Sequence, residues 1–289
     1  MLKTFTPPKR TLLTALAALA TLGSAAVSAA PPVNIDLFST AQATLTDNTV
    51  NGHVRSAQIG SAADTTILGG FRELILDLKS NGGVPSRLAE IGVFGGVLDL
   101  SVSTLSTATA ILRWDGPTRS TGDDSAGVQP INTTGLQASP GVGLNIGNGS
   151  TDSFEFYTLF SDGGYKFVIE AYTDADHWSR LEIQSQVHRT PTRSQIPMAV
   201  FGACGLDDGQ VKVSCAHANS FAHAVDFSNL GALQTIIDPD GARRSLDLTF
   251  DQATAVVPEP ASMGLLLAGL ALLAWRRGGP RPATATRRH

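Results

Sequence analysis

Residues 153–172 read SFEFYTLFSDGGYKFVIEAY, and this stretch decides the fold class. On both sides of Ser161-Asp162-Gly163-Gly164, apolar and polar residues alternate with a period of two, which is typical of half-buried β-strands. Asp and Gly at the centre favour a turn. We therefore predict a β-hairpin whose aromatic face, with Phe154 and Phe156, packs in the core.

The same short alternating runs recur from about residue 31 to residue 250. The clearest is 71–79, with Leu74, Leu76 and Leu78 on one face. Turn residues separate about a dozen such runs, and none shows sustained helical periodicity. This pattern predicts an all-β fold with two packed antiparallel sheets, a sandwich of jelly-roll type, with a barrel as the alternative. The turn-rich segment 116–149 is expected to form loops, where a binding site would lie.

The N-terminus has the three parts of a secretory signal peptide. Lys3, Lys9 and Arg10 precede the apolar segment 11–22, and Val27-Ser28-Ala29 offers small residues for cleavage. We predict a signal peptide over 1–29 and an exported β-domain over 30–254. The Sec translocon and signal peptidase are the expected partners of this end.

An uncharged, leucine-rich segment at 261–275 lies near the other end. As a helix it would cover about 22 Å, less than the roughly 30 Å hydrocarbon core of a bilayer. Trp275 and the following arginines supply the interfacial aromatic and the positive flank of a membrane span. We predict one transmembrane helix. A buried C-terminal helix is the alternative, and apolar residues on every face count against it.

This tail resembles the PEP-CTERM sorting signal of Gram-negative bacteria. The resemblance rests on a short motif, the helix and an arginine pair: Pro258, Glu259, Pro260, Ala261, Ser262, Arg276 and Arg277. It covers only about residues 256–277, and the sorting signal is assigned to 255–289. Residues 278–289 make a longer tail than is usual for this signal.

In that family a membrane-embedded enzyme, the exosortase, is thought to recognise Pro-Glu-Pro and to process the tail. Its substrates tend to belong to exopolysaccharide-producing species. The resemblance therefore implies export across the inner membrane, a transient membrane anchor, and then a cell-surface or extracellular location. Exosortase and exopolysaccharide are the expected partners.

The charge of the chain is unevenly distributed. Residues 31–260 hold all 25 acidic residues but only 13 of the 21 basic ones, so this part has a formal charge of −12. Such an acidic body argues against nucleic acid or an anionic membrane as its partner.

Cys204 and Cys215 are the two cysteines of a chain bound for an oxidising compartment. A disulfide that closes this loop is predicted, worth roughly 3 kcal/mol in the chain-entropy model. The competing interpretation, a metal site with His217 or His223, needs reduced thiols and is disfavoured.

Calcium is the one cofactor that the sequence suggests, and the suggestion is weak. The candidate ligands are Asp174, Asp176, Asp238 and Asp240. Aspartates at this spacing also form Asx turns, which is the favoured interpretation.

No catalytic motif is found, so no catalytic residue is assigned. Four glutamates on predicted strands are candidates for a hydrolytic pair, and outward-facing strand acids would give the same pattern: Glu73, Glu155, Glu170 and Glu182. Five aromatic residues either pack in the core or form a sugar-stacking platform: Trp114, Tyr157, Tyr165, Tyr172 and Trp178. We predict a non-enzymatic structural or glycan-adhesive protein of the cell envelope or biofilm matrix. A polysaccharide hydrolase or lyase is the alternative.

Overall fold

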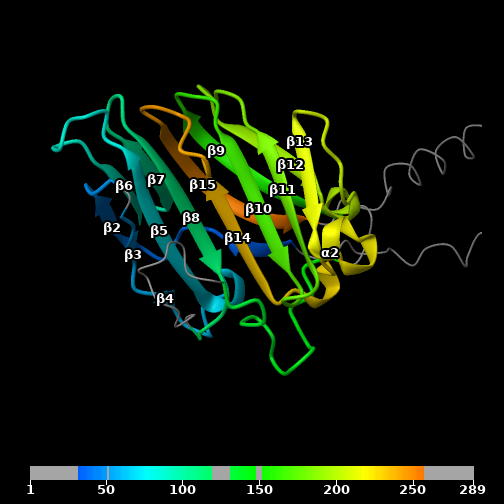
Figure 1. Cartoon of the computed structure of the whole chain (residues 1–289). Coiled ribbons are helices and arrows are strands. Elements are labelled where there is room, and N and C mark those ends of the chain that lie inside the picture. Colours follow the sequence, from blue (N-terminus) through cyan, green and yellow to red (C-terminus); the bar gives the residue numbers. More distant parts are fainter. Residues whose placement is uncertain (1–31, 51, 119–130, 148–151, 257–289) are drawn as a thin grey trace, which may run out of the picture. The chain divides into compact units, whose positions relative to one another are not determined.

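The computed structural model describes residues 32–50, 52–118, 131–147 and 152–256 (Figure 1). These residues belong to one compact unit, Pro31–Pro258. The predicted signal peptide and the predicted transmembrane helix lie outside the described residues. Within the described residues, no helix has the length and apolar character needed to cross a membrane.

Seven antiparallel strands form the first sheet, called sheet A. Their order is β12-β9-β15-β7-β6-β2, and β1 also pairs with β15. The strands are β1 (Val33–Asp36), β2 (Gln42–Asp47), β6 (Ala89–Phe94), β7 (Val97–Val102), β9 (Ser153–Ser161), β12 (Thr192–Pro197) and β15 (Asp247–Val256).

Eight antiparallel strands form the second sheet, called sheet B. Their order is β13-β11-β10-β14-β8-β5-β3, and β4 also pairs with β5. The strands are β3 (Val54–Arg55), β4 (Ile59–Gly60), β5 (Phe71–Ser80), β8 (Thr107–Trp114), β10 (Lys166–Tyr172), β11 (Trp178–Gln184), β13 (Val211–Cys215) and β14 (Ala232–Ile237). Short helices connect some of them: η1 (Leu68–Gly70), η3 (Met198–Gly202), α2 (Ala216–Asn219), η4 (Phe221–His223) and η5 (Phe227–Asn229).

The two sheets face each other, and one hydrophobic core lies between them (Figure 1). The predicted strand 71–79 is β5, and its Leu74, Leu76 and Leu78 are fully buried in this core. The prediction of an all-β sandwich of two antiparallel sheets is thus confirmed. Its finer assignment to the jelly-roll type stays a prediction.

The predicted hairpin over 153–172 is wrong. β9 pairs with β12 and β15 in sheet A, whereas β10 pairs with β11 and β14 in sheet B. Stacked sheets lie about 10 Å apart, and four linking residues reach about 13 Å, so the turn is long enough to cross between them. The aromatic faces do meet in the core, where the rings of Phe156 and Phe167 pack edge to face at 5.0 Å.

Two details concern the last strand and the loop 116–149. β15 continues to Val256, two residues beyond the predicted end of the domain, because it keeps pairing with β9 to that point. The described part of the predicted loop 116–149 is irregular, as expected. Residues 142–146 of this segment form only isolated bridges, such as that between Leu144 and Leu230.

A buried ion pair joins the two sheets. Arg72 Nη1 on β5 contacts both carboxylate oxygens of Asp36 on β1, at 2.7 and 2.9 Å. Arg72 Nε donates to Gln42 at 2.8 Å, and Trp114 Nε1 donates to Asp36 Oδ2 at 3.0 Å. Burial raises the pKa of Asp36, and the charge of Arg72 opposes that rise. We call Asp36, Gln42, Arg72 and Trp114 the interior cluster.

Candidate functional site: the outer face of sheet B

Five polar side chains form one line across the outer face of sheet B. The strand register places Glu73 beside Arg113, Arg113 beside Gln234, Gln234 beside Glu170, and Glu170 beside Arg180. Their neighbours along each strand point into the core, so these five point away from it. We call them the polar row.

The polar row is linked by hydrogen bonds and ion pairs. Arg113 Nε donates to Gln234 Oε1 at 3.1 Å, and Gln234 Nε2 donates in turn to Glu170 Oε2. Arg113 Nη1 also lies 3.9 Å from Glu73 Oε2, and Glu73 is paired with Arg55. These contacts link the side chains of the row from one strand to the next.

Glu170 is the centre of the more open end of the row. Its carboxylate accepts hydrogen bonds from Arg180 and from the hydroxyl of Tyr172, the latter at 2.9 Å. Arg180 also binds Glu182, with 3.0 Å between Nε and Oε1. Burial and the neighbouring Glu170 charge raise the pKa of Tyr172, so its hydroxyl stays protonated.

An aromatic pair borders this end. Tyr172 on β10 and Trp178 on β11 are directly opposite in the ladder, with ring centroids 6.4 Å apart and planes tilted by 41°. Both side chains are half-buried and share the outer face with Glu170 and Arg180. The arrangement combines partly accessible ring surface with hydrogen-bonding groups that accept and donate.

The other aromatic candidates lie elsewhere. Trp114 and Tyr165 are only 1% and 3% exposed and pack in the core. Tyr157 is on β9 of sheet A, where the guanidinium of Arg193 lies 5.4 Å from its ring centroid. Of the five predicted aromatics, the structure therefore brings two together on a surface, Tyr172 and Trp178.

Each of the four strand glutamates pairs with an arginine. Glu73 binds Arg55, Glu170 and Glu182 both bind Arg180, and Glu155 lies 3.2 Å from Arg193. The polar row places Glu73 and Glu170 three strand spacings apart, about 14 Å, whereas a hydrolytic pair of carboxylates needs about 5–9.5 Å. Arg180 lies between Glu170 and Glu182, where a glycosidic oxygen or a water would have to bind.

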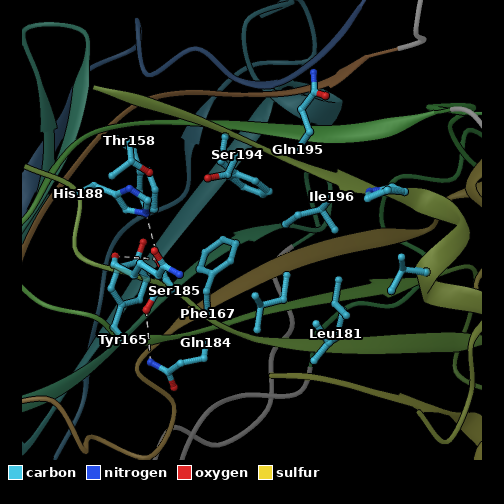
Figure 2. A pocket seen from close by; sticks show the side chains of 17 residues that line it. Thr158, Tyr165, Phe167, Leu181, Gln184, Ser185, His188, Ser194, Gln195 and Ile196 are labelled. Carbon is cyan, nitrogen blue, oxygen red and sulfur yellow. Dashed lines mark hydrogen bonds between the residues drawn. The ribbon is translucent and has the colours of Figure 1, made fainter. Parts of the chain in front are cut away.

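A cavity of about 420 Å³ opens between the two sheets, near edge strands β12 and β13. Figure 2 shows Thr158, Ser185 and His188 on one side of it, and Ile196 and Leu181 on the other. Among the described residues that line it, none is Asp, Glu, Lys or Arg. Ser185 Oγ lies 3.4 Å from His188 Nε2, but no lining carboxylate orients this histidine as a catalytic triad requires. The cavity suits an uncharged, largely apolar molecule.

The predicted disulfide is present. Cys204 and Cys215 are bonded, with their Cα atoms 5.4 Å apart. Backbone hydrogen bonds cross the loop that this disulfide closes, such as the one from Gly205 N to Val213 O at 3.0 Å.

The calcium candidates lie in two separate turns. Asp174 Oδ1 accepts hydrogen bonds from the backbone N–H groups of Asp176 and His177 at 2.8 and 2.9 Å, which is the Asx turn that the sequence favoured. The oxygens of Asp238 cap a second turn, and Asp240 pairs with Lys166. Across the described residues, no group of three or more His, Cys, Asp or Glu side chains is placed so that it could hold a metal ion.

Of the predicted sorting signal, 255–289, the first two residues end β15, and residues 257–289 lie outside the described residues. A family model described as "PEP-CTERM protein-sorting motif" matches residues 256–278, the segment that carries the resemblance. The chain thus carries a PEP-CTERM sorting motif at its C-terminal end. This motif implies processing by an exosortase, and proteins that carry it are exported and sorted to the cell surface.

Two solved structures share remote similarity with the β-domain. One is titled "Structure of PfGH50B", with 9% identity and a TM-score of 0.34, over 73% of this chain and 30% of that one. This chain thus spans under a third of that protein. The other is the family 11 carbohydrate-binding module of Clostridium thermocellum in complex with a beta-1,3-1,4-mixed-linked tetrasaccharide, with 8% identity and a TM-score of 0.32, over 75% of this chain and 96% of that one. No curated protein matches the chain.

Proposed function

We propose that the β-domain is a non-enzymatic glycan-binding module, carried to the cell surface by the sorting motif. The observation that carries this proposal is the Tyr172–Trp178 pair beside Glu170 and Arg180 on the outer face of sheet B. A sugar ring has apolar C–H faces that pack on aromatic rings, and hydroxyls that both donate and accept hydrogen bonds. The aromatic pair and the polar row offer both kinds of contact side by side.

Hydroxyl-rich polysaccharide is the ligand class that best fits this face. The formal charge of −12 over residues 31–260 repels anionic polymers unless cations bridge them. Guanidinium, carboxylate and amide groups together suit the neutral hydroxyls of a glycan. In the cell this ligand would be exopolysaccharide of the biofilm matrix, which the protein would join structurally.

The polysaccharide hydrolase or lyase is the weaker proposal. An arginine binds each of the four candidate glutamates, which leaves no pair among them with a gap for a glycosidic oxygen. Incubation of the protein with the same polysaccharide should release no new reducing or unsaturated ends. Release of either would overturn the non-enzymatic part of the proposal.

Affinity electrophoresis of the purified protein through gels that contain the producer's own exopolysaccharide tests the binding. We expect the polysaccharide to retard the unaltered protein. Trp178→Ala should lower the affinity derived from this retardation by about tenfold, which corresponds to about 1.4 kcal/mol. Phe94→Ala, which removes a 52% exposed aromatic from β6 of sheet A, is the matched control and should bind as the unaltered protein does. Equal retardation of the unaltered protein and both variants would contradict the proposal. So would a lack of retardation of the unaltered protein both with and without calcium.

For the targeting ends, we propose cleavage after Ala29, a transient anchor through the helix at 261–275, and removal of the tail near Pro258. Intact-mass analysis of the cell-derived protein tests these steps together. We expect a mass that lacks both ends and is a further ~2 Da lower, because formation of the disulfide removes one hydrogen from each cysteine. A mass that retains residues 1–29 or 261–289 would contradict the corresponding step.

A further inference from the structure

The cavity between the two sheets is separate from the outer face of sheet B and has a chemistry of its own. Its volume of about 420 Å³ lies within the roughly 300–1,000 Å³ of small-molecule pockets. Protein interiors are otherwise closely packed, with few voids larger than a water molecule. A space of this size beside the core is large enough for a free small molecule.

The sequence of edge strand β12 accounts for the space. Sheet A ends at β12 and sheet B ends at β13, and the cavity opens between these two strands. Ser194 and Ile196 line it from β12, whereas Arg193 between them is 63% exposed. The register places Ser194 beside Phe156 of β9. Because serine is small, this inward position leaves room that a large apolar residue would fill.

Three phenylalanine rings form an apolar wall of the cavity. Phe156, Phe167 and Phe250 line it, and each is only 4–7% exposed. The ring centroids of Phe167 lie 5.0 Å from those of Phe156 and 6.1 Å from those of Phe250. Val200 of η3 and Val211 of β13 add aliphatic surface. Such a lining favours the apolar body of a ligand, because binding removes apolar surface of both from water.

Polar groups lie together at one end of the cavity, where Figure 2 shows Thr158, Ser185 and His188. Ser185 Oγ lies 3.4 Å from His188 Nε2. Thr158 is only 3% exposed, and its hydroxyl makes no hydrogen bond to another side chain or backbone group among the described residues. A buried hydroxyl without a partner is unfavourable, so a ligand that pairs with it gains affinity. This end favours a group that donates or accepts a hydrogen bond.

The lining is also free of acidic side chains and of lysine and arginine among the described residues. Burial raises the pKa of Tyr165, so this lining hydroxyl stays uncharged as well. An ionised ligand would lose its hydration here without gaining an ion pair, which is unfavourable. A sugar would place several hydroxyls against the phenylalanine wall, where they would find no partner. The cavity therefore selects a different chemistry from the polar row.

We propose that this cavity binds a small, uncharged amphiphile. Its apolar body lies against Phe156, Phe167 and Phe250, and its one hydroxyl or carbonyl group lies near Thr158, Ser185 and His188. A medium-chain alcohol represents this class. The site stands whether or not the outer face of sheet B binds glycan, because the two sites share no residue of the polar row.

Fluorescence titration of the purified protein with phenylnaphthylamine, an uncharged probe whose emission rises in apolar surroundings, tests the proposal. We expect saturable binding of one probe per chain and its displacement by decanol. Decanoate has the same chain length and an ionised head, so it should displace the probe about tenfold less well at pH 8, where histidine is ordinarily neutral. Equal displacement by decanol and decanoate would overturn the proposal of an uncharged ligand.

Ser194→Leu should weaken probe binding by about tenfold, because the larger side chain occupies the cavity from β12. Arg193→Leu places the same side chain at the neighbouring exposed position and is the matched control, which should bind as the unaltered protein does. Thr158→Val keeps the shape of the side chain and removes its hydroxyl. It should weaken the binding of decanol by about fivefold, since the alcohol loses a hydrogen-bond partner.

The Tm of each variant without ligand shows whether it is folded. Probe binding that survives Ser194→Leu, or that falls equally in Arg193→Leu, would overturn the site. If Ser194→Leu lowers the Tm, Val211→Phe narrows the cavity from β13 and should weaken the probe in the same way. Fluorescence that never saturates and that no variant changes would indicate contact with exposed apolar residues such as Phe221, and would also overturn the site.

Discussion

Two carboxylate–guanidinium pairs in this protein differ mainly in where they lie. Asp36 and Arg72 join the sheets, and both side chains are 0% exposed. Glu170 and Arg180 lie on the outer face of sheet B, with side chains 11% and 27% exposed. The interior pair is enclosed by groups of the protein itself, whereas the outer pair borders the half-buried rings of Tyr172 and Trp178. The same chemistry is fully enclosed between the sheets in one place and lies partly exposed on the outer face in the other.

Among the variants that test this comparison, Arg72→Met should cause the largest loss of stability. The substitution leaves the Asp36 carboxylate buried without its cation, so we expect a loss of about 3–5 kcal/mol in the free energy of unfolding. Chemical denaturation measures it. Arg193→Met, which removes a cation whose side chain is 63% exposed, is the control and should cost no more than about 1 kcal/mol. Equal losses in the two variants would remove the distinction between interior and surface pairs.

The loss in the free energy of unfolding that Arg72→Met causes should also depend on pH. Burial raises the pKa of Asp36, and removal of Arg72 removes the opposing charge. A carboxyl with a raised pKa stabilises the fold fully below about pH 3.8, its unfolded value, and this contribution is lost as the pH rises through the folded pKa.

We therefore expect the gap between Arg72→Met and the unaltered protein to be smaller at pH 4 than at pH 7. Denaturation curves at the two pH values measure it. A gap that is constant, or wider at pH 4, would show that Asp36 does not respond to the loss of Arg72.

Arg180→Met should have the smallest effect on stability and a clear one on binding. Glu170 keeps Gln234 and Tyr172 as donors, and the site is partly solvated, so we expect a loss of about 1 kcal/mol or less in the free energy of unfolding. Affinity for the exopolysaccharide should fall by about tenfold, because the ligand loses a charged donor. Denaturation and affinity electrophoresis on the same sample measure the two effects. A large stability loss without a binding loss would make this pair structural, like the interior one.

Local patterns in the sequence were enough for several features. Alternation in β5 and in β9 shows which face is buried, because the side chains of a strand alternate by necessity. Cys204 and Cys215 lie on a short loop, so their pairing follows from the compartment and the spacing. The sorting motif is recognised from contiguous residues, and it matches at 256–278.

These local patterns do not predict which strands pair with each other. β9 and β10 follow each other and bury aromatic rings in one core, yet they belong to different sheets. Alternation identifies a buried face but does not say whether the next strand lies beside it or across from it. The predicted hairpin failed for that reason.

The polar row was missed for the same reason. Glu73, Glu170 and Glu182 were expected on outward faces, and they are there. Their alignment with Arg113, Gln234 and Arg180 depends on ladder register across five strands, which no local pattern encodes. A search for outward-facing polar residues on every strand would have found the members but not their order.

The sequence by itself determined the class of the fold, the disulfide and the sorting motif, because each is written in neighbouring residues or in a period of two. The tertiary structure alone decided which strands pair, that Tyr172 and Trp178 share a surface, that arginines bind the strand glutamates, and that a cavity opens between edge strands β12 and β13. Those outcomes depend on contacts between residues far apart in the chain. Their geometry is set by the packing of two sheets around one core.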